Sequence, residues 1–189
     1  MGSISSEYLP HYIYEDYCLW EGNWELMAGK AVAMSPAPTI NHQTAAYAIA
    51  RELGDDIDNC EKCLVLGETD YKITDDTVLR PDVALICEET NDIFITRAPE
   101  IIVEVISKTT ASRDENYKFK IYEAEKVKYY ILIYPDTCLA KVYKLKGEHY
   151  SKEGDFSYCL LYTSPSPRDQ REHLVCRLLL EKGGGGGGG

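Results

Sequence analysis

Apolar positions in this chain come in short blocks separated by glycine, proline and charged residues, and the strongest blocks predict buried strands. Residues 99–107 predict the strongest strand. Its middle, residues 101–106, is apolar on both faces apart from Glu104, which is typical of a central strand covered on two sides. Residues 128–134 predict a second buried strand, and residues 138–145 predict its hairpin partner across Pro135 and Asp136. These segments are the expected core of a sheet.

Two segments have helical periodicity. Within residues 42–57 the apolar side chains recur every four positions, so they lie on one helix face. They are Ala45, Ile49 and Leu53. Thr39 or Asn41 can cap this helix after a proline-rich break at residues 35–38. Residues 112–126 predict a second helix. Its inward side chains are expected to be Phe119, Tyr122 and Ala124.

The remaining segments predict short elements around this core. They are a helix at 14–21, a hairpin of 24–28 with 30–34, strands at 64–66 and 69–73, and an apolar run at 78–87 that Arg80, Pro81 and Asp82 interrupt. The order of strands and helices predicts an α/β (α+β) fold, in which a mixed central sheet is flanked by helices.

The last part of the chain differs in composition from the rest. Residues 183–189 are all glycine, which cannot form a packed element, and residues 159–172 resemble a translated linker or adapter. We therefore expect one domain at residues 1–158, truncated at its C-terminus, and a tail at 159–189 that is non-native or disordered. The alternative is a native proline-rich tail.

Composition and charge bear on three properties of the protein: nucleic-acid binding, membrane association and disulfide bonding. The formal charge is −11, and a strongly acidic protein binds nucleic acid poorly outside a specific cleft. We expect no membrane association, since there is no long apolar run and no secretory signal pattern at the N-terminus. The seven cysteines are irregularly spaced. They are expected to be buried thiols of a cytoplasmic protein, without a disulfide framework.

Glu104 is the residue whose chemistry stands out. A carboxylate within a buried strand costs several kcal/mol unless it is paired, protonated or bound to a metal. Strand alternation places Glu104 on one face with Ile102 and Ile106. The alternative is an exposed strand position or a structural ion pair.

Asp82 and Lys118 are the next candidates. Asp82 follows Pro81 at the start of an apolar strand, so its carboxylate is expected near the rim of the sheet. Two carboxylates on neighbouring strands can hold Mg²⁺, which prefers oxygen ligands. Lys118, on the helix after the Glu104 strand, can orient a metal-bound water or offset charge on a phosphate. The plainer alternatives are a turn aspartate and a solvated helix lysine.

Three weaker signals remain. Glu25, in the first hairpin, can complete a metal shell or support a water. His42, at the start of the long helix, can contact phosphate or shuttle a proton, although a structural polar contact is as good an explanation. Cys60 and Cys63 form a lone CxxC without a second pair at zinc spacing, so no metal is expected there.

Several segments, taken in order, resemble a known family. They are Trp24-Glu-Leu-Met-Ala-Gly-Lys, Met34-Ser-Pro with His42-Gln43, Arg80-Pro-Asp-Val-Ala, Pro99-Glu-Ile-Ile-Val-Glu-Val-Ile-Ser, Asp114 to Tyr122, and Tyr129-Tyr-Ile-Leu-Ile. Over about residues 8–150 the chain resembles the Uma family of restriction-endonuclease-like proteins, within the PD-(D/E)xK nuclease superfamily. Its members are mostly bacterial and abundant in cyanobacteria.

The resemblance implies a mixed four-stranded core sheet with flanking helices and Mg²⁺-dependent phosphodiester hydrolysis. Asp82 matches the family's Pro-Asp, and Glu104 matches the glutamate of its Val-Glu-Val. The superfamily's lysine, expected two residues after that glutamate, is Ile106 here, and the resemblance moves this role to Lys118. Glu25 is carried over as well, and Lys108 is the substitute if Lys118 is misaligned.

These observations predict a DNA endonuclease that uses Mg²⁺ or Mn²⁺. Asp82 and Glu104 are the expected metal ligands, Lys118 and Glu25 act with them in catalysis, and His42 and Lys108 are expected to contact the substrate. A homodimer is plausible for an enzyme that cuts two strands. The alternatives are a catalytically inactive nucleic-acid-binding or regulatory module on the same fold, which the acidic charge favours, and a structural or partner-binding subunit.

Overall fold

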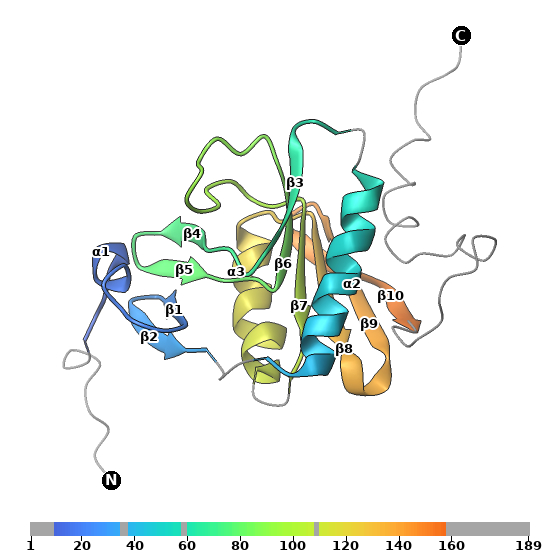
Figure 1. Cartoon of the computed structure of the whole chain (residues 1–189), viewed down its shortest axis with the longest axis horizontal. Coiled ribbons are helices and arrows are strands. Elements are labelled where there is room, and N and C mark those ends of the chain that lie inside the picture. Colours follow the sequence, from blue (N-terminus) through green and yellow to red (C-terminus); the bar gives the residue numbers. More distant parts are fainter. Residues whose placement is uncertain (1–9, 35–37, 58–59, 108–109, 158–189) are drawn as a thin grey trace.

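A computed structural model describes residues 10–34, 38–57, 60–107 and 110–157 of the chain, and its main body is a six-stranded mixed sheet (Figure 1). The strand order is β10-β9-β8-β7-β6-β3, and of these neighbours only β7 and β8 are parallel. The bounds are β3 Cys63–Gly67, β6 Val83–Cys87, β7 Ile101–Val105, β8 Tyr129–Tyr134, β9 Leu139–Lys146 and β10 His149–Ser157.

A second, antiparallel sheet stands beside the first and has the order β2-β1-β5-β4. Its strands are β1 Trp24–Met27, β2 Lys30–Ala33, β4 Tyr71–Thr74 and β5 Thr77–Leu79. The apolar run at 78–87 is therefore two strands in two sheets. Pro81 lies in the link, where its missing backbone donor is tolerated. The chain crosses from the small sheet to the large one at residues 80–82.

Helices cover both faces of the large sheet, as Figure 1 shows. Helix α2, Ile40–Asp56, lies on one face and is capped by Thr39, whose hydroxyl accepts from the backbone N of His42 at 3.2 Å. Helix α3, Phe119–Ala124, lies on the other face and continues a π-helical segment, η2 Arg113–Lys118. The short elements α1, Tyr14–Tyr17, and the 3₁₀ turn η3, Pro135–Thr137, complete the fold.

The two faces of the large sheet build two apolar layers. Ala45, Ile49 and Leu53 of α2 pack on the face that includes Val103 and Val105, so the predicted helix face is confirmed. The opposite layer contains Ile102, Tyr122 and Leu132. Burial on both sides explains the continuous apolar sequence of β7.

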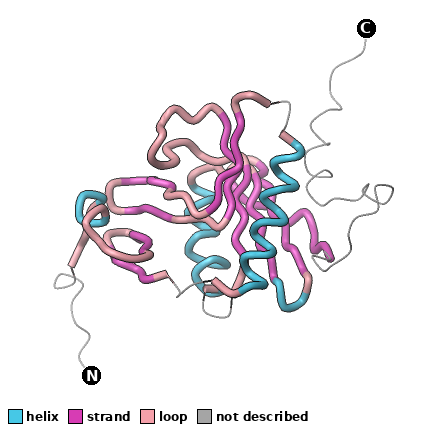
Figure 2. The backbone as a smooth tube through the Cα atoms, in the orientation of Figure 1, coloured by secondary structure: helices cyan, strands magenta, loops and turns pink. Residues whose placement is uncertain are grey.

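Several predictions about elements were wrong in detail. The large sheet has six strands instead of four, and β10 was not predicted. The segment predicted as one regular helix at 112–126 is part π-helix, and Ala124 is exposed because α3 ends there. The expected tail at 159–189 lies outside the described residues. Figure 2 shows how strands and loops dominate the region of the small sheet.

The prediction that all cysteines are reduced thiols was wrong for one pair. Cys63 and Cys87 form a disulfide between β3 and β6, where the two residues are directly opposite each other. The pairing follows from strand register, which the irregular spacing of cysteines along the chain does not reveal. Within the described residues, no helix is both long and apolar enough to cross a lipid bilayer.

Candidate active site

Lys118 lies at the centre of a buried ionic cluster. Its side chain is 2% exposed, and its Nζ donates to Glu104 Oε1 at 2.9 Å and lies 2.8 Å from Glu25 Oε1. Asp114 Oδ1 lies 3.7 Å from the same nitrogen. The hydroxyl of Tyr122 donates to Glu104 Oε1 at 3.0 Å. Three carboxylates thus share one ammonium group in a region that excludes water.

The members of this cluster come from three separate elements. Glu104 is in β7, on the face that α3 covers, and strand alternation turns it away from α2. Glu25 is in β1 of the small sheet and is completely buried. Lys118 ends the π-helical segment that follows β7. The cluster is therefore the point where the two sheets and a helix meet.

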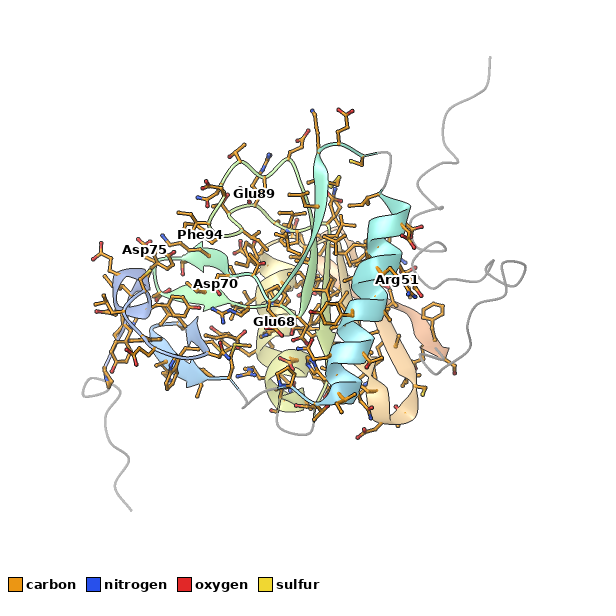
Figure 3. The ribbon with its side chains drawn as sticks, in the orientation of Figure 1. Arg51, Glu68, Asp70, Asp75, Glu89 and Phe94 are labelled. Carbon is orange, nitrogen blue, oxygen red and sulfur yellow. A yellow bond between two sulfur atoms is a disulfide. The ribbon has the colours of Figure 1, made fainter. Side chains whose placement is uncertain are left out.

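The link between the sheets fixes the position of Glu25. The backbone N of Arg80 donates to Glu25 Oε1 at 3.0 Å. The Arg80 guanidinium is held in turn, since its Nε donates to Asp70 Oδ1 at 2.7 Å and a terminal nitrogen donates to the hydroxyl of Tyr17 at 3.1 Å. Figure 3 labels Asp70 on the segment that leads into β4. A chain of polar contacts thus ties the crossover to the buried cluster.

The π-helical segment presents two charged side chains to the cluster. Asp114 and Lys118 are four residues apart and both only 2% exposed. Arg113 lies beside them, with a terminal nitrogen 3.5 Å from Glu25 Oε2. A π-helical turn is rare and is found frequently at functional sites. The sequence pattern predicted an ordinary helix here and contains no signal of the wider turn.

Asp82 lies at the rim of the sheet next to the cluster. Its Oδ2 accepts from the backbone N of Val105 at 2.6 Å and lies 3.2 Å from His42 Nε2. Glu68 stands close by, accepting from Gln43 Nε2 at 3.2 Å, and Figure 3 labels it on the loop that faces α2. Asp82 precedes β6 and Glu104 is in β7, so the two carboxylates come from adjacent strands.

The electrostatics of the cluster are dominated by burial and by an excess of carboxylates. Burial raises the pKa of Glu104 well above its usual range, Lys118 opposes this, and the neighbouring Asp114, Asp82 and Glu25 raise it further. Burial also raises the pKa of Asp114. Burial alone would lower the pKa of Lys118, but the carboxylates of Glu104, Glu25 and Asp114 outweigh it, and the net shift is upward. Lys118 is therefore held as an ammonium ion.

Among the residues that the structure describes, two buried carboxylate oxygens in this region have no hydrogen-bond donor, although a cation lies within 4 Å of each. They are Glu25 Oε2 and Asp114 Oδ1. With Asp82 and Glu104 they belong to a set of four carboxyl groups, which faces the two fixed cations Lys118 and Arg113 and the titratable His42. Carboxylate oxygens are the donor type that a hard divalent cation such as Mg²⁺ prefers.

The carboxylates are not already arranged as a closed set of ligands. In the part of the chain that the structure describes, the one group of three or more metal-ligand side chains with donor atoms within 4.8 Å of one another is Cys60, Cys63 and Cys87. Between the carboxylates stands the Lys118 ammonium group. A cation bound by Asp82 and Glu104 would therefore require a shift of side chains, together with water ligands.

The structure brings together most of the residues proposed from the sequence. Glu25, Glu104 and Lys118 are in direct contact, and Asp82 and His42 pair beside them. Lys108 lies outside the described residues. Sequence reasoning missed Asp114, Arg113 and Tyr122 as members of the site. The spacing of Asp114, Lys118 and Tyr122 at four-residue intervals was the available signal.

Known proteins with similar sequences and folds agree with this architecture. An uncharacterized protein of Synechocystis sp. is 28% identical over 142 residues, which cover 72% of this chain and 76% of that protein. The crystal structure of a protein described as a putative nuclease belonging to DUF820, from Anabaena variabilis, superposes with a TM-score of 0.63 at 14% identity. The match covers 77% of this chain and 84% of that one. The fold is therefore restriction-endonuclease-like.

The family profile Uma2, described as "Putative restriction endonuclease", matches residues 14–157. This match spans the small sheet, the large sheet and every residue of the buried cluster. The chain therefore belongs to the Uma2 family.

Proposed function

We propose that this protein hydrolyses phosphodiester bonds in DNA with Mg²⁺ or Mn²⁺ as cofactor. The observation that carries the proposal is the buried contact of Lys118 with Glu104 and Glu25, beside Asp82, on a restriction-endonuclease-like fold. A structural ion pair needs one carboxylate for one ammonium group. The surplus of carboxylates around Lys118 is what supports a site for a cation and a phosphate.

Asp82 and Glu104 are the residues that we assign as cation ligands, with Asp114 and Glu25 adjacent. The bound cation would lower the pKa of a coordinated water and withdraw charge from the scissile phosphate. Glu104 would be ionised in this state, since a positive charge next to a carboxylate favours its charged form. The hydroxyl of Tyr122 keeps Glu104 in one orientation.

Lys118 acts as a fixed positive charge in this proposal. Burial lowers its pKa, but the carboxylates of Glu104, Glu25 and Asp114 outweigh burial and raise the pKa overall, which favours the ammonium form. An ammonium group can donate to the attacking water or to a phosphate oxygen and so stabilise the negative charge that develops there. Glu25 holds the ammonium group in place from the opposite side.

His42 is the residue that we assign to the substrate side of the site. The hydrogen bond and charge of Asp82 raise its pKa, although partial burial acts in the opposite direction. A protonated His42 can contact a phosphate. Its Nδ1 is buried without a hydrogen-bond partner among the described residues, while its Nε2 lies 3.2 Å from Asp82 Oδ2.

Cleavage of supercoiled plasmid DNA, with and without Mg²⁺, tests the proposal. We expect cleavage that requires Mg²⁺ or Mn²⁺ and that Asp82→Asn and Glu104→Gln each abolish. Lys118→Met should reduce cleavage by about 10²–10³-fold, which is the range for loss of one preorganised charge-stabilising donor. The matched control is Lys120→Met on the same helical run, because Lys120 is exposed and should be dispensable.

A protein that cleaves equally well after Asp82→Asn and Glu104→Gln would contradict the assignment. Each variant is accepted only if its circular dichroism spectrum matches that of the wild type. For the carboxylate variants the control is Glu148→Gln, since Glu148 is exposed in the β9–β10 turn.

One observation favours a second function. A formal charge of −11 disfavours binding to the phosphate backbone. A catalytically inactive regulatory module on the same fold, which does not bind nucleic acid, would explain it. Calorimetric titration with Mg²⁺ separates the two, because an inactive module should bind no Mg²⁺ through Asp82 and Glu104. The homodimer and the cytoplasmic location remain predictions from the sequence.

A further inference from the structure

Three cysteine side chains meet at the far end of β6 from Asp82. Cys63 starts β3, Cys87 ends β6, and Cys60 lies in the turn just before β3. Their sulfur atoms all lie within 4.8 Å of one another. The CxxC motif, which seemed isolated along the sequence, gains its third thiol because the antiparallel pairing of β3 with β6 places Cys87 opposite Cys63.

A disulfide alone does not explain this arrangement. Cys63 is bonded to Cys87, and yet the Cys60 sulfur lies only 2.7 Å from the Cys63 sulfur. A sulfur atom in a disulfide has no second covalent bond to offer. Once the S–S bond is reduced, the three sulfurs can move apart to about 3.8 Å, the separation that metal–sulfur bonds of about 2.3 Å require in a tetrahedral site.

The local backbone matches a thiolate metal site. The Cys63 backbone N donates to the Cys60 carbonyl at 3.1 Å, so the motif folds as a tight turn that points both sulfurs the same way. Structural zinc sites take cysteine pairs at this spacing, and zinc accepts three protein ligands with a water in the fourth position.

The surroundings leave room for that fourth ligand. The cysteines line an open hollow of about 460 Å³. Lys62 and Arg97 line it too and lie 3.4 and 3.9 Å from carboxylate oxygens of Glu88.

We propose that Cys60, Cys63 and Cys87 form a three-thiolate site for a soft divalent cation, with Zn²⁺ as its occupant. The Cys63–Cys87 disulfide is the oxidised form, which does not bind the metal. A dithiol or phosphine reductant supplies the two electrons that break the S–S bond, and two protons complete the thiols. When the cation binds, the three thiols release their protons to solvent.

Cobalt titration of the reduced full-length protein tests this site. Co²⁺ replaces Zn²⁺ in thiolate sites and gives sulfur-to-metal charge-transfer absorption. We expect this absorption in reduced wild-type protein at about one equivalent of Co²⁺, its displacement by Zn²⁺, and none in protein that keeps the disulfide. Cys60→Ser and Cys87→Ser should each lose it.

Matched controls are available in the same chain. Cys18→Ser and Cys138→Ser change free cysteines elsewhere in the described fold and should leave the titration unchanged. The double variant Cys159→Ser/Cys176→Ser removes the two cysteines that lie outside the described residues. It should also behave as the wild type.

Two results would overturn the proposal. One is reduced wild-type protein that gives no charge-transfer absorption, which would leave the cysteines with a disulfide role only. The other is a Cys60→Ser variant that binds Co²⁺ as well as the wild type does. Cys60→Ser keeps the Cys63–Cys87 pair intact, so this variant decides the question even if Cys87→Ser does not fold.

Discussion

The two ends of strand β6 carry opposite kinds of chemistry. At the Asp82 end, carboxylates and an ammonium group are packed into a buried cluster. At the Cys87 end, roughly 17 Å away along the strand, three sulfur atoms meet at a partly exposed edge. Oxygen ligands suit Mg²⁺, and thiolates suit Zn²⁺.

The difference lies in what holds each group together. The carboxylate cluster depends on the balance of charge, so removal of one member leaves another buried charge unpaired. The cysteine cluster consists of like groups, and its bonding depends on oxidation state. The stability of the carboxylate cluster should therefore change with charge substitutions, and the stability of the cysteine cluster with reductant and soft metals.

The largest effect is expected from removing the central charge. Lys118→Met leaves Glu25, Glu104 and Asp114 without their shared partner, and we expect the free energy of unfolding to fall by about 3–5 kcal/mol. Urea unfolding at neutral pH measures it. Lys120→Met should change stability by less than about 0.5 kcal/mol. Equal effects of the two substitutions would mean that the buried cluster carries little energy.

Reduction of the Cys63–Cys87 disulfide tests how much the cysteine end of β6 contributes to stability. Cys63 and Cys87 are 24 residues apart, and a loop of that size should contribute about 3 kcal/mol to stability. Urea unfolding with and without reductant measures this contribution. Cys87→Ala should make stability independent of reductant. A wild-type protein that does not respond would contradict the assigned pairing.

Stabilisation by metal ions should distinguish the carboxylate cluster from the cysteine cluster. A cation at about 100 times its dissociation constant stabilises a protein by about 2.7 kcal/mol. We expect Mg²⁺ to raise the melting temperature of Cys60→Ser but not of Asp82→Asn. Zn²⁺ added to the reduced proteins should raise the melting temperature of Asp82→Asn but not of Cys60→Ser. Thermal unfolding of both variants with each metal measures this, and a metal that stabilises both variants alike would show binding elsewhere.

A smaller effect is expected from the hydroxyl that orients Glu104. Tyr122→Phe removes one donor from a buried carboxylate and should cost about 1 kcal/mol. Tyr47→Phe is the control, because Tyr47 is 74% exposed on α2. If the two substitutions have the same effect on urea unfolding, the hydrogen bond to Glu104 adds nothing to the stability of the cluster.

The smallest effect concerns the loop after β6. Partial burial would raise the pKa of Glu89, but hydrogen bonds from the backbone of Asn91 and Thr96, with others, lower it to about 2 from an ordinary 4.5. A carboxyl group whose pKa is lower in the folded protein than in the unfolded chain stabilises the fold at pH values above its pKa in the unfolded chain. Glu89→Gln should therefore lose less than about 1 kcal/mol above pH 4.5, and the difference should vanish as pH falls toward 2. Unfolding at several pH values checks this.

Much of the fold was accessible from sequence because the signals are local. The continuous apolar run around Glu104 predicted the central strand, and four-residue periodicity predicted the buried face of α2. The break at Pro81 could be recognised in the sequence, but its consequence, two sheets instead of one, depends on pairing between distant strands. The contact of Cys63 with Cys87 could not be predicted either, because it also depends on the pairing of distant strands.

The site was accessible in part. Glu104 was evident because a charge interrupts an apolar strand. Lys118 was a candidate because it lies on the helix after that strand, and the family resemblance pointed to the same residue. Asp114 appears in the sequence as one more polar residue at the start of a helix. Only the π-helical turn and the docking of β1 show that Asp114 and Glu25 share the ammonium group.

The origin of Glu25 in the small sheet has a consequence for how activity arises. Neither sheet holds a complete set of charged groups, so a chain in which only the large sheet has formed lacks part of its chemistry. The charged groups of the cluster then come together only when the two sheets have docked correctly. A nuclease built in this way would stay harmless to nucleic acid until its folding is finished.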